Sequence, residues 1–238
     1  IRDGKMVSYN QFSDILLPKP DKEEQQKIAD CLSSIDDLIS AEDKKLSALK
    51  DHKKGLMQKL FPAEGKTIPE WRFPEFRNGG EWNSDTIGRV CSSYSGGTPT
   101  TSKDKYYGGN IPFIRSGEID KDTTELFLTE SGLENSSAKM VSEGDILVAL
   151  YGANSGDVAL SKINGAINQA ILCLNYDRIN AFVYHFLTHK KRWIIKTYIQ
   201  GGQGNLSGEI IKSIEFMFPK QIEEESKIVA CLSSVDEL

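Results

Sequence analysis

The chain has 238 residues and a formal net charge of −5, and 39% of its residues are hydrophobic, which is enough for one domain core and an additional helical element. No apolar run approaches the roughly 20 residues that cross a bilayer, and the start, IRDGKMVSYN, lacks the pattern of a secretion signal. We therefore expect a cytoplasmic protein without a membrane partner.

A long helix is the first predicted element. Asp21 is a suitable N-cap, Glu23 and Glu24 suit the positive end of the helix dipole, and Phe61-Pro62 ends the pattern. Apolar residues in steps of three and four predict a coiled-coil interface along one face of a rod of roughly 57 Å. These interface residues are Ile28, Leu32, Ile35, Ile39, Leu46, Leu49, Leu56 and Leu60. We expect self-association or docking through this face; the alternative is a helix packed on its own domain.

Residues 65–221 are predicted to form one globular domain. Strand-like runs at 144–152, 156–161 and 168–176 are bounded by turn residues, a helix is expected over 181–199, and the run IIKSIEFMFPK is expected to close the domain as a strand. The fold class is therefore α/β or α+β, with the globular domain attached to long coiled-coil helices.

The last segment repeats the start of the long helix. EEESKIVACLSSVDEL (223–238) matches EEQQKIADCLSSIDDL (23–38) at ten of sixteen positions, and each copy follows an apolar run that ends in Pro-Lys. The repeat indicates two copies of one structural unit. We expect two large modules, with the end of one at residues 1–20 and the second at residues 65–221.

Enzyme signatures are absent from the sequence. It contains no phosphate-binding loop, HExxH, GxSxG or GxGxxG motif, and no Asn/Asp-Pro-Pro-aromatic motif of a DNA methyltransferase. His185 and His189, four residues apart, lack nearby carboxylate or cysteine partners, so we expect no metal site. The chain is therefore predicted to be non-catalytic and to bind no cofactor itself.

Three polar, glycine-rich loops are the candidate binding elements. They cover residues 93–120, 151–157 and 200–208, and their glycines let the backbone approach a ligand closely. Residues 71–206 hold 14 Lys/Arg and 14 Asp/Glu, so this region has no large electrostatic footprint. The basic stretch HKKRW (189–193) adds a local patch or a solvated helix face.

The combination of these segments resembles the specificity subunit of type I restriction-modification enzymes. The resemblance covers nearly the whole chain and rests on GGTPTTSKDKYYGGNIPFIRSGEI, on GDILVALYGANSG followed by NQAILCL, on PKP before EEQQKIADCLSSID, and on KKGLMQKLFP. It implies two target recognition domains held apart by two conserved helices that pack as an antiparallel coiled coil. Each domain reads half of a bipartite site in double-stranded DNA.

The resemblance also implies the partners and the domain limits. Methylation (M) subunits would bind S-adenosylmethionine, and a restriction (R) subunit would use ATP and Mg²⁺. Residues 1–20 would be the tail of a first recognition domain, 21–64 the conserved long helix, 65–221 a complete recognition domain, and 222–238 the start of the second conserved helix. The chain would be a fragment or a half-length subunit that pairs with a copy of itself.

The candidate DNA contacts come from the three loops. Lysine and arginine are expected to touch phosphate, whereas amides are better suited to base edges. The candidates are Lys103, Lys105, Tyr106, Tyr107, Arg115, Ser116, Tyr151, Asn154, Ser155, Gln203 and Asn205. The alternative function is a coiled-coil adaptor whose globular domain binds protein; it is favoured if the loops are scattered over the surface.

Overall fold

The computed structural model describes residues 8–198 and 205–236. The chain divides after Lys50 into two compact units, residues 1–50 and 51–238. Helices and sheets are both present, which confirms the expected α+β class. Within the described residues, none of the helices combines the length and the apolar character that a bilayer crossing requires.

The first unit contains a short helix α1 (Tyr9–Ser13), an extended segment, and most of helix α2 (Lys22–Leu60). Asp21 begins α2, because its carboxylate accepts the N–H of Glu24 at 2.9 Å. Five of the predicted interface residues are aliphatic and yet have 45–58% of their surface exposed. They are Ile28, Leu32, Ile35, Ile39 and Leu46. Leu49 is half-buried.

The second unit begins with the last turns of α2. Leu60 and Phe61 are each 1% exposed and belong to the main core of this unit, and Leu56 packs against that core. The Phe61 ring packs against Phe182 at 5.3 Å between centroids. The last members of the predicted interface, Leu56 and Leu60, therefore pack on the globular domain, as the alternative expected. The coiled-coil role of the exposed members stays a prediction.

The strands form two four-stranded sheets and a two-stranded ribbon. The first sheet has the antiparallel order β2 (Cys91–Ser95), β9 (Ile171–Tyr176), β6 (Ile146–Ala149), β7 (Val158–Leu160). The second sheet has the order β4 (Phe127–Leu128), β3 (Tyr107–Ile114), β8 (Gly165–Ile167), β5 (Lys139–Val141), with β3 and β8 parallel. The ribbon pairs β1 (Asn83–Thr86) with β10 (Glu215–Phe218).

The first sheet is buried on both faces, which explains the continuous apolar runs in its strands. Side chains alternate along β6, so that Ile146 and Val148 face the main core, which also contains residues of helix α5 (Asn180–Tyr198). Leu147 and Ala149 face a second core shared with Ile167 of the other sheet. A one-residue shift in register would exchange these two faces.

Short helices complete the second unit: η1 (Pro74–Phe76), α3 (Ile87–Val90), η2 (Asp104–Tyr106), α4 (Glu130–Glu134), η3 (Gly152–Asn154) and α6 (Gly208–Ser213). Helix α6 corrects the expectation that residues 210–220 form one strand. Ser207 caps it by accepting the N–H of Ile210 at 3.2 Å, and only Glu215–Phe218 remain as strand β10. The N-cap at Ser207 favours a helix here, although the β-branched residues that follow it favour a strand.

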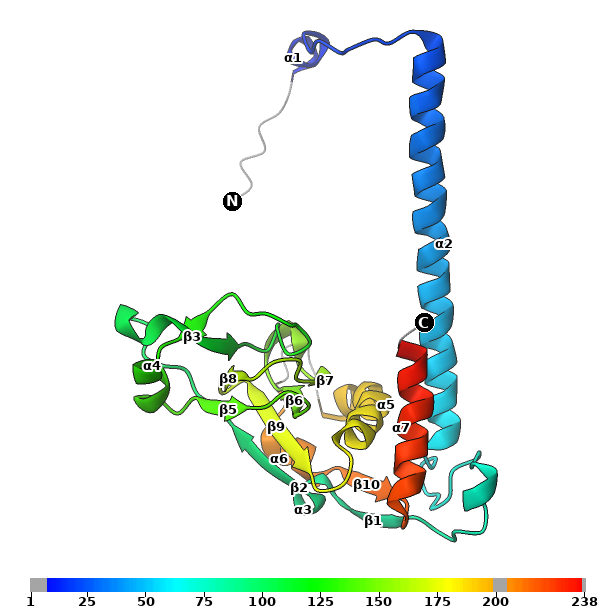
Figure 1. Ribbon diagram of the computed structural model, residues 1–238, viewed down its shortest axis with the longest axis vertical. Coiled ribbons are helices and arrows are strands. Elements are labelled where there is room, and N and C mark those ends of the chain that lie inside the picture. Colours follow the sequence, from blue (N-terminus) through cyan, green and yellow to red (C-terminus); the bar gives the residue numbers. More distant parts are fainter. Residues whose placement is uncertain (1–7, 199–204, 237–238) are drawn as a thin grey trace. The chain divides into compact units, whose positions relative to one another are not determined.

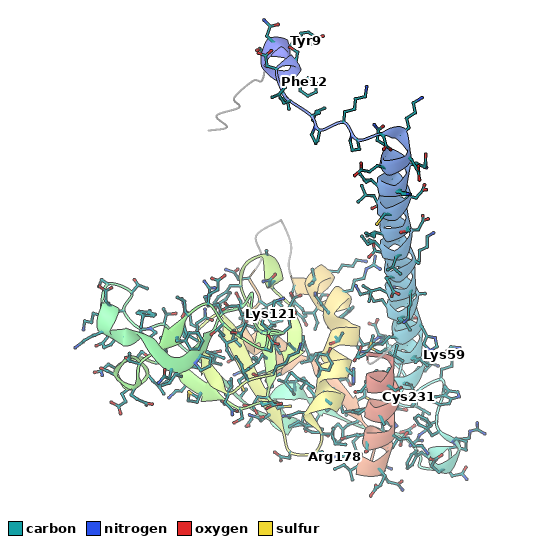
Figure 2. All side chains as sticks on the ribbon, turned by 45° about the horizontal axis from the view of Figure 1, so that its top comes forward. Tyr9, Phe12, Lys59, Lys121, Arg178 and Cys231 are labelled. Atoms are coloured by element: carbon teal, nitrogen blue, oxygen red, sulfur yellow. The ribbon has the colours of Figure 1, made fainter. Side chains whose placement is uncertain are left out.

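Helix α7 (Ile222–Asp236) is fastened to the second unit by buried ion pairs. Arg72 donates to both carboxylate oxygens of Glu224, at 2.6 and 2.7 Å, with both side chains almost fully buried. Arg178, labelled in Figure 2, pairs with the buried Glu225 at 3.0 Å. At the other end Lys53 pairs with Asp236, and α7 runs antiparallel to the last turns of α2 (Figure 1).

Candidate nucleic-acid interface

The first predicted loop places two lysines over one tyrosine. The ammonium nitrogens of Lys103 and Lys105 lie 5.2 and 5.5 Å from the ring centroid of Tyr106. Tyr106 is only 5% exposed, so it supports these two charges and does not offer an open stacking face. The segment is tied to α4 through Thr129, whose hydroxyl donates to the carbonyl of Lys105 at 2.8 Å.

Gly96 and Gly97 of the first loop are packed closely against the rest of the chain. A Cβ on Gly96 would lie 1.8 Å from the carbonyl oxygen of Ile167, and one on Gly97 would lie 2.0 Å from the hydroxyl of Ser137. The idea that these glycines admit a ligand is therefore replaced by close packing of backbone on β8. The next residues are also engaged, since the Tyr107 hydroxyl donates to the carbonyl of Pro99 at 2.8 Å.

Arg115 braces the turn that follows β3. Its guanidinium donates to Glu118 at 2.9 and 3.0 Å and to Glu125 at 2.5 Å. The hydrogen bonds with Glu118 and then Glu125 raise the pKa of Arg115 above its usual value. A phosphate contact by Arg115 would compete with these carboxylates, whereas the neighbouring Ser116 is half-buried and hydrogen-bonds to none of them.

Two loops and a helix meet in one polar cleft of about 340 Å³. Loop 116–121 contributes Ser116 and Lys121, and the β6–β7 loop contributes Asn154. The loops nearly touch, because a Cβ on Gly117 would lie 3.2 Å from the amide nitrogen of Asn154. Lys121 is exposed and is labelled in Figure 2. The cleft therefore joins two predicted loops around a hydroxyl, an amide and an ammonium group, together with the carboxylate of Asp120.

Helix α5 closes the cleft with Thr188 and Lys191. Lys191 pairs with Asp157, a further lining residue at the end of the β6–β7 loop. Because both partners of this pair are 39% exposed, water weakens it and the lysine can exchange to a ligand phosphate. Lys121 and Lys191 were absent from the predicted set. Lys121 lies one residue beyond the predicted loop, and Lys191 lies within the stretch HKKRW.

The described end of the third loop, from residue 205, adjoins the second loop. The N–H of Leu206 donates to the carbonyl of Leu150 at 2.9 Å, which brings the exposed Asn205 next to the loop that carries Tyr151. The Ser155 hydroxyl donates to the same carbonyl at 2.8 Å and so holds the turn. Gln203 lies outside the described residues. The structure thus brings Ser116 and Asn154 into one cleft and places Asn205 next to the loop that carries Tyr151, whereas Lys103–Tyr107 are fixed beside α4.

Of the two histidines of α5, His185 is buried and His189 is half-buried. Burial lowers the pKa of His185 to about 4, and His189 stacks on the ring of Phe61 at 5.8 Å between centroids. Across residues 8–198 and 205–236, no three metal-binding side chains are grouped. These rings are therefore packing groups of α5.

The family is decided by a protein-family model described as Type I restriction modification DNA specificity domain, which matches residues 79–238. The chain belongs to this specificity family. The match includes all three loops and helix α7.

Individual members of the specificity family are distant in sequence. The MjaX type I restriction enzyme specificity subunit of Methanocaldococcus jannaschii is 26% identical over 242 residues, which cover 98% of this chain and 55% of that protein. The EcoR124I/EcoR124II specificity subunit of Escherichia coli is 26% identical over 168 residues, which cover 66% of this chain and 41% of that protein. The chain spans about half the length of the curated relatives it matches.

Solved structures share the fold of this specificity-family chain. The HsdS subunit of Thermoanaerobacter tengcongensis matches with a TM-score of 0.59 and 20% identity, over 100% of this chain and 57% of that one. The type I S subunit of M. genitalium matches with a TM-score of 0.64 and 15% identity, over 91% of this chain and 55% of that one.

Proposed function

We propose that the chain is a non-catalytic specificity subunit, or half of one, whose second unit reads one part of a bipartite DNA sequence. The observation that carries this proposal is the cleft in which two loops of the specificity domain present Ser116, Asn154 and Lys121 together. An amide can pair with a base edge in both directions, and an ammonium group suits phosphate. The adaptor alternative would be favoured by scattered loops. Parts of two loops converge in this cleft, whereas Lys103–Tyr107 lie beside α4, so the adaptor remains the second candidate function.

The proposed partners follow from the family. M subunits would supply adenine N6 methylation with S-adenosylmethionine, and an R subunit would supply ATP- and Mg²⁺-dependent translocation and cleavage. The relatives named above are specificity subunits of type I restriction enzymes. The assembled enzyme would act on DNA in the cytoplasm.

The proposed domain limits are residues 1–20, 21–64, 65–221 and 222–238. They are supported by a second feature of the repeat, because the order short helix, extended Pro-Lys segment, long helix occurs twice. It is α1 and α2 in the first copy, and α6, β10 and α7 in the second. Paired copies would form a pseudo-two-fold complex that addresses half-sites about one DNA turn, roughly 34 to 36 Å, apart.

We call the cleft between loop 116–121, the β6–β7 loop and α5 the reading cleft, and Asn154→Ala tests its role in base recognition. The assembled methylation complex is incubated with a pool of randomised duplexes, and bound molecules are sequenced. We expect the variant to lose preference at one base position, worth about 1–3 kcal/mol, with the rest of the motif retained. Asn78→Ala, on an exposed residue of the segment before β1, is the matched control. An unchanged motif would remove Asn154 from base readout.

A further inference from the structure

A basic groove lies between the last turns of α2 and helix α5, and none of the predicted DNA contacts that the structure describes lines it. It encloses about 790 Å³ between residues 54–64 and residues 188–196. We call it the basic groove because five cations line it: Lys54, Lys190, Lys191, Arg192 and Lys196. Both of its walls belong to the second unit.

The charge of the basic groove is not balanced locally. Within the described part of the chain, Glu64 is the one carboxylate that lines it. Of the five cations, Lys191 forms an ion pair with Asp157. In residues 8–198 and 205–236, the other four cations have no carboxylate within ion-pair distance. Unpaired like charges repel one another, so an anionic ligand would relieve this cluster.

An exposed tryptophan stands among these cations. Trp193 is 40% exposed, and the ammonium group of Lys190 lies 5.9 Å from its ring centroid. This arrangement holds Lys190 beside the groove without neutralising its charge. It also places a fluorescent side chain where a bound ligand would change its surroundings.

The basic groove is continuous with the reading cleft. Thr188 and Lys191, which lie within one turn of α5, line both the groove and the cleft. Double-stranded DNA carries one negative charge per ~1.7 Å, and a duplex seated at the cleft extends past its recognised bases. Long, flexible cations without a fixed acceptor geometry suit phosphates, which position a duplex without specifying its sequence.

We propose that the basic groove binds the phosphate backbone of the duplex just outside the recognised half-site, as a sequence-independent contact. The inference rests on the proposed function, since it takes the adjoining cleft as the reading site. It adds Lys190, Arg192 and Lys196 as positioning residues and assigns them the salt-dependent part of the affinity.

The test is the salt dependence of binding to a duplex of about 30 base pairs of arbitrary sequence, measured by fluorescence anisotropy from roughly 50 to 200 mM KCl. The groove variant is Lys190→Gln, Arg192→Gln, Lys196→Gln. The control variant, Lys139→Gln, Lys162→Gln, Lys220→Gln, removes the same charge from exposed residues outside the groove. We expect the groove variant to reduce the slope of log K against log salt by about two to three, and the control by less than about one.

Trp193 gives an independent readout. Its fluorescence should change when the duplex is added, and Trp193→Phe should remove that change while binding persists. Equal slopes for the groove and control variants would overturn this inference and leave the proposed function standing. A wild-type chain that binds no duplex even at low salt would overturn both. A groove variant that binds the duplex normally but loses the M subunit would overturn it in favour of an acidic protein partner.

Discussion

Gly96 and Gly97 allow the start of the first loop to pack closely against Ile167 of strand β8 and against Ser137. Their lack of a side chain matters because the carbonyl of Ile167 and the side chain of Ser137 occupy the space. A glycine-rich stretch is equally suited to ligand approach and to close packing of the chain. For that reason its composition alone did not distinguish the two roles.

Gly96→Ala should therefore destabilise the second unit. The added methyl group would overlap backbone that cannot move without disturbing the second sheet, and we expect the free energy of unfolding to fall by about 3 kcal/mol. Gly55→Ala on α2, where nothing lies within 4 Å, should instead stabilise by about 0.5–1 kcal/mol. Urea denaturation measures both, and a neutral Gly96→Ala would contradict the packing.

Lys121 and Lys191 show where residue-level prediction reached its limit. Ser116 and Asn154 were predicted from loop chemistry, and the structure brings them together. The two lysines come from a turn and from a helix far apart in the sequence, so only the fold places them in the same cleft. Their residue types were informative, but their proximity was not encoded in any local pattern.

The stability that helix α7 contributes should depend on pH through Glu225. Burial raises the pKa of Glu225 to about 7, opposed by the charge of Arg178 and by the hydroxyl of Tyr176, which donates at 3.0 Å, while the charge of Glu224 adds to the rise. The folded chain holds this proton up to about pH 7, whereas the unfolded chain releases it near the ordinary carboxyl pKa of 4.5. The contribution to stability is therefore complete below pH 4.5 and is lost as pH rises through 7.

Glu225→Gln should flatten this dependence. Between pH 5 and 8 we expect the free energy of unfolding of the wild-type chain to fall more than that of the variant, by a difference on the order of 3 kcal/mol. Glu223→Gln, at an exposed neighbouring position, should keep the wild-type profile. Parallel profiles for wild type and Glu225→Gln would show that this carboxyl group does not titrate in that range.

The exposed face of α2 is the second element with a testable role. Aliphatic residues that are half exposed favour association, because burying them against another helix removes apolar surface from water. Ile28→Asp with Ile35→Asp should lower self-association at least tenfold in sedimentation equilibrium. Ser33→Asp with Ser40→Asp, on the opposite side of the helix, should change it little. A wild-type chain that stays monomeric at high concentration would contradict this role.

The sequence predicted the helices and strands that have a regular apolar pattern, but it did not predict features that depend on a single cap or on contacts between distant segments. The 3.6-residue pattern located α2 and α5, and alternating or apolar runs located β6 and β9. Helix α6 was missed because its apolar residues resemble a strand and one serine decides the conformation. The buried pairs of Arg72 and Arg178 with Glu224 and Glu225 join segments more than 40 residues apart, and no local signal announces such pairs.

In the whole complex, DNA recognition and methyl transfer would belong to different chains. The second unit would carry the sequence preference, and partner subunits would carry the methyl transfer. Exchange of residues 65–221 for the corresponding segment of a specificity subunit with a different target should therefore move the preference with the segment. The long helix, and with it the spacing between half-sites, stays unchanged in such a chimera.

Mapping methylated adenines in DNA from cells that express the parent complex, with either the natural chain or this chimera, is the most direct test. The account predicts that one half of the bipartite motif changes to that of the donor, while the other half and the spacing remain. A motif that is identical with both chains, or methylation without regard to surrounding bases, would contradict the claim that the second unit reads DNA sequence.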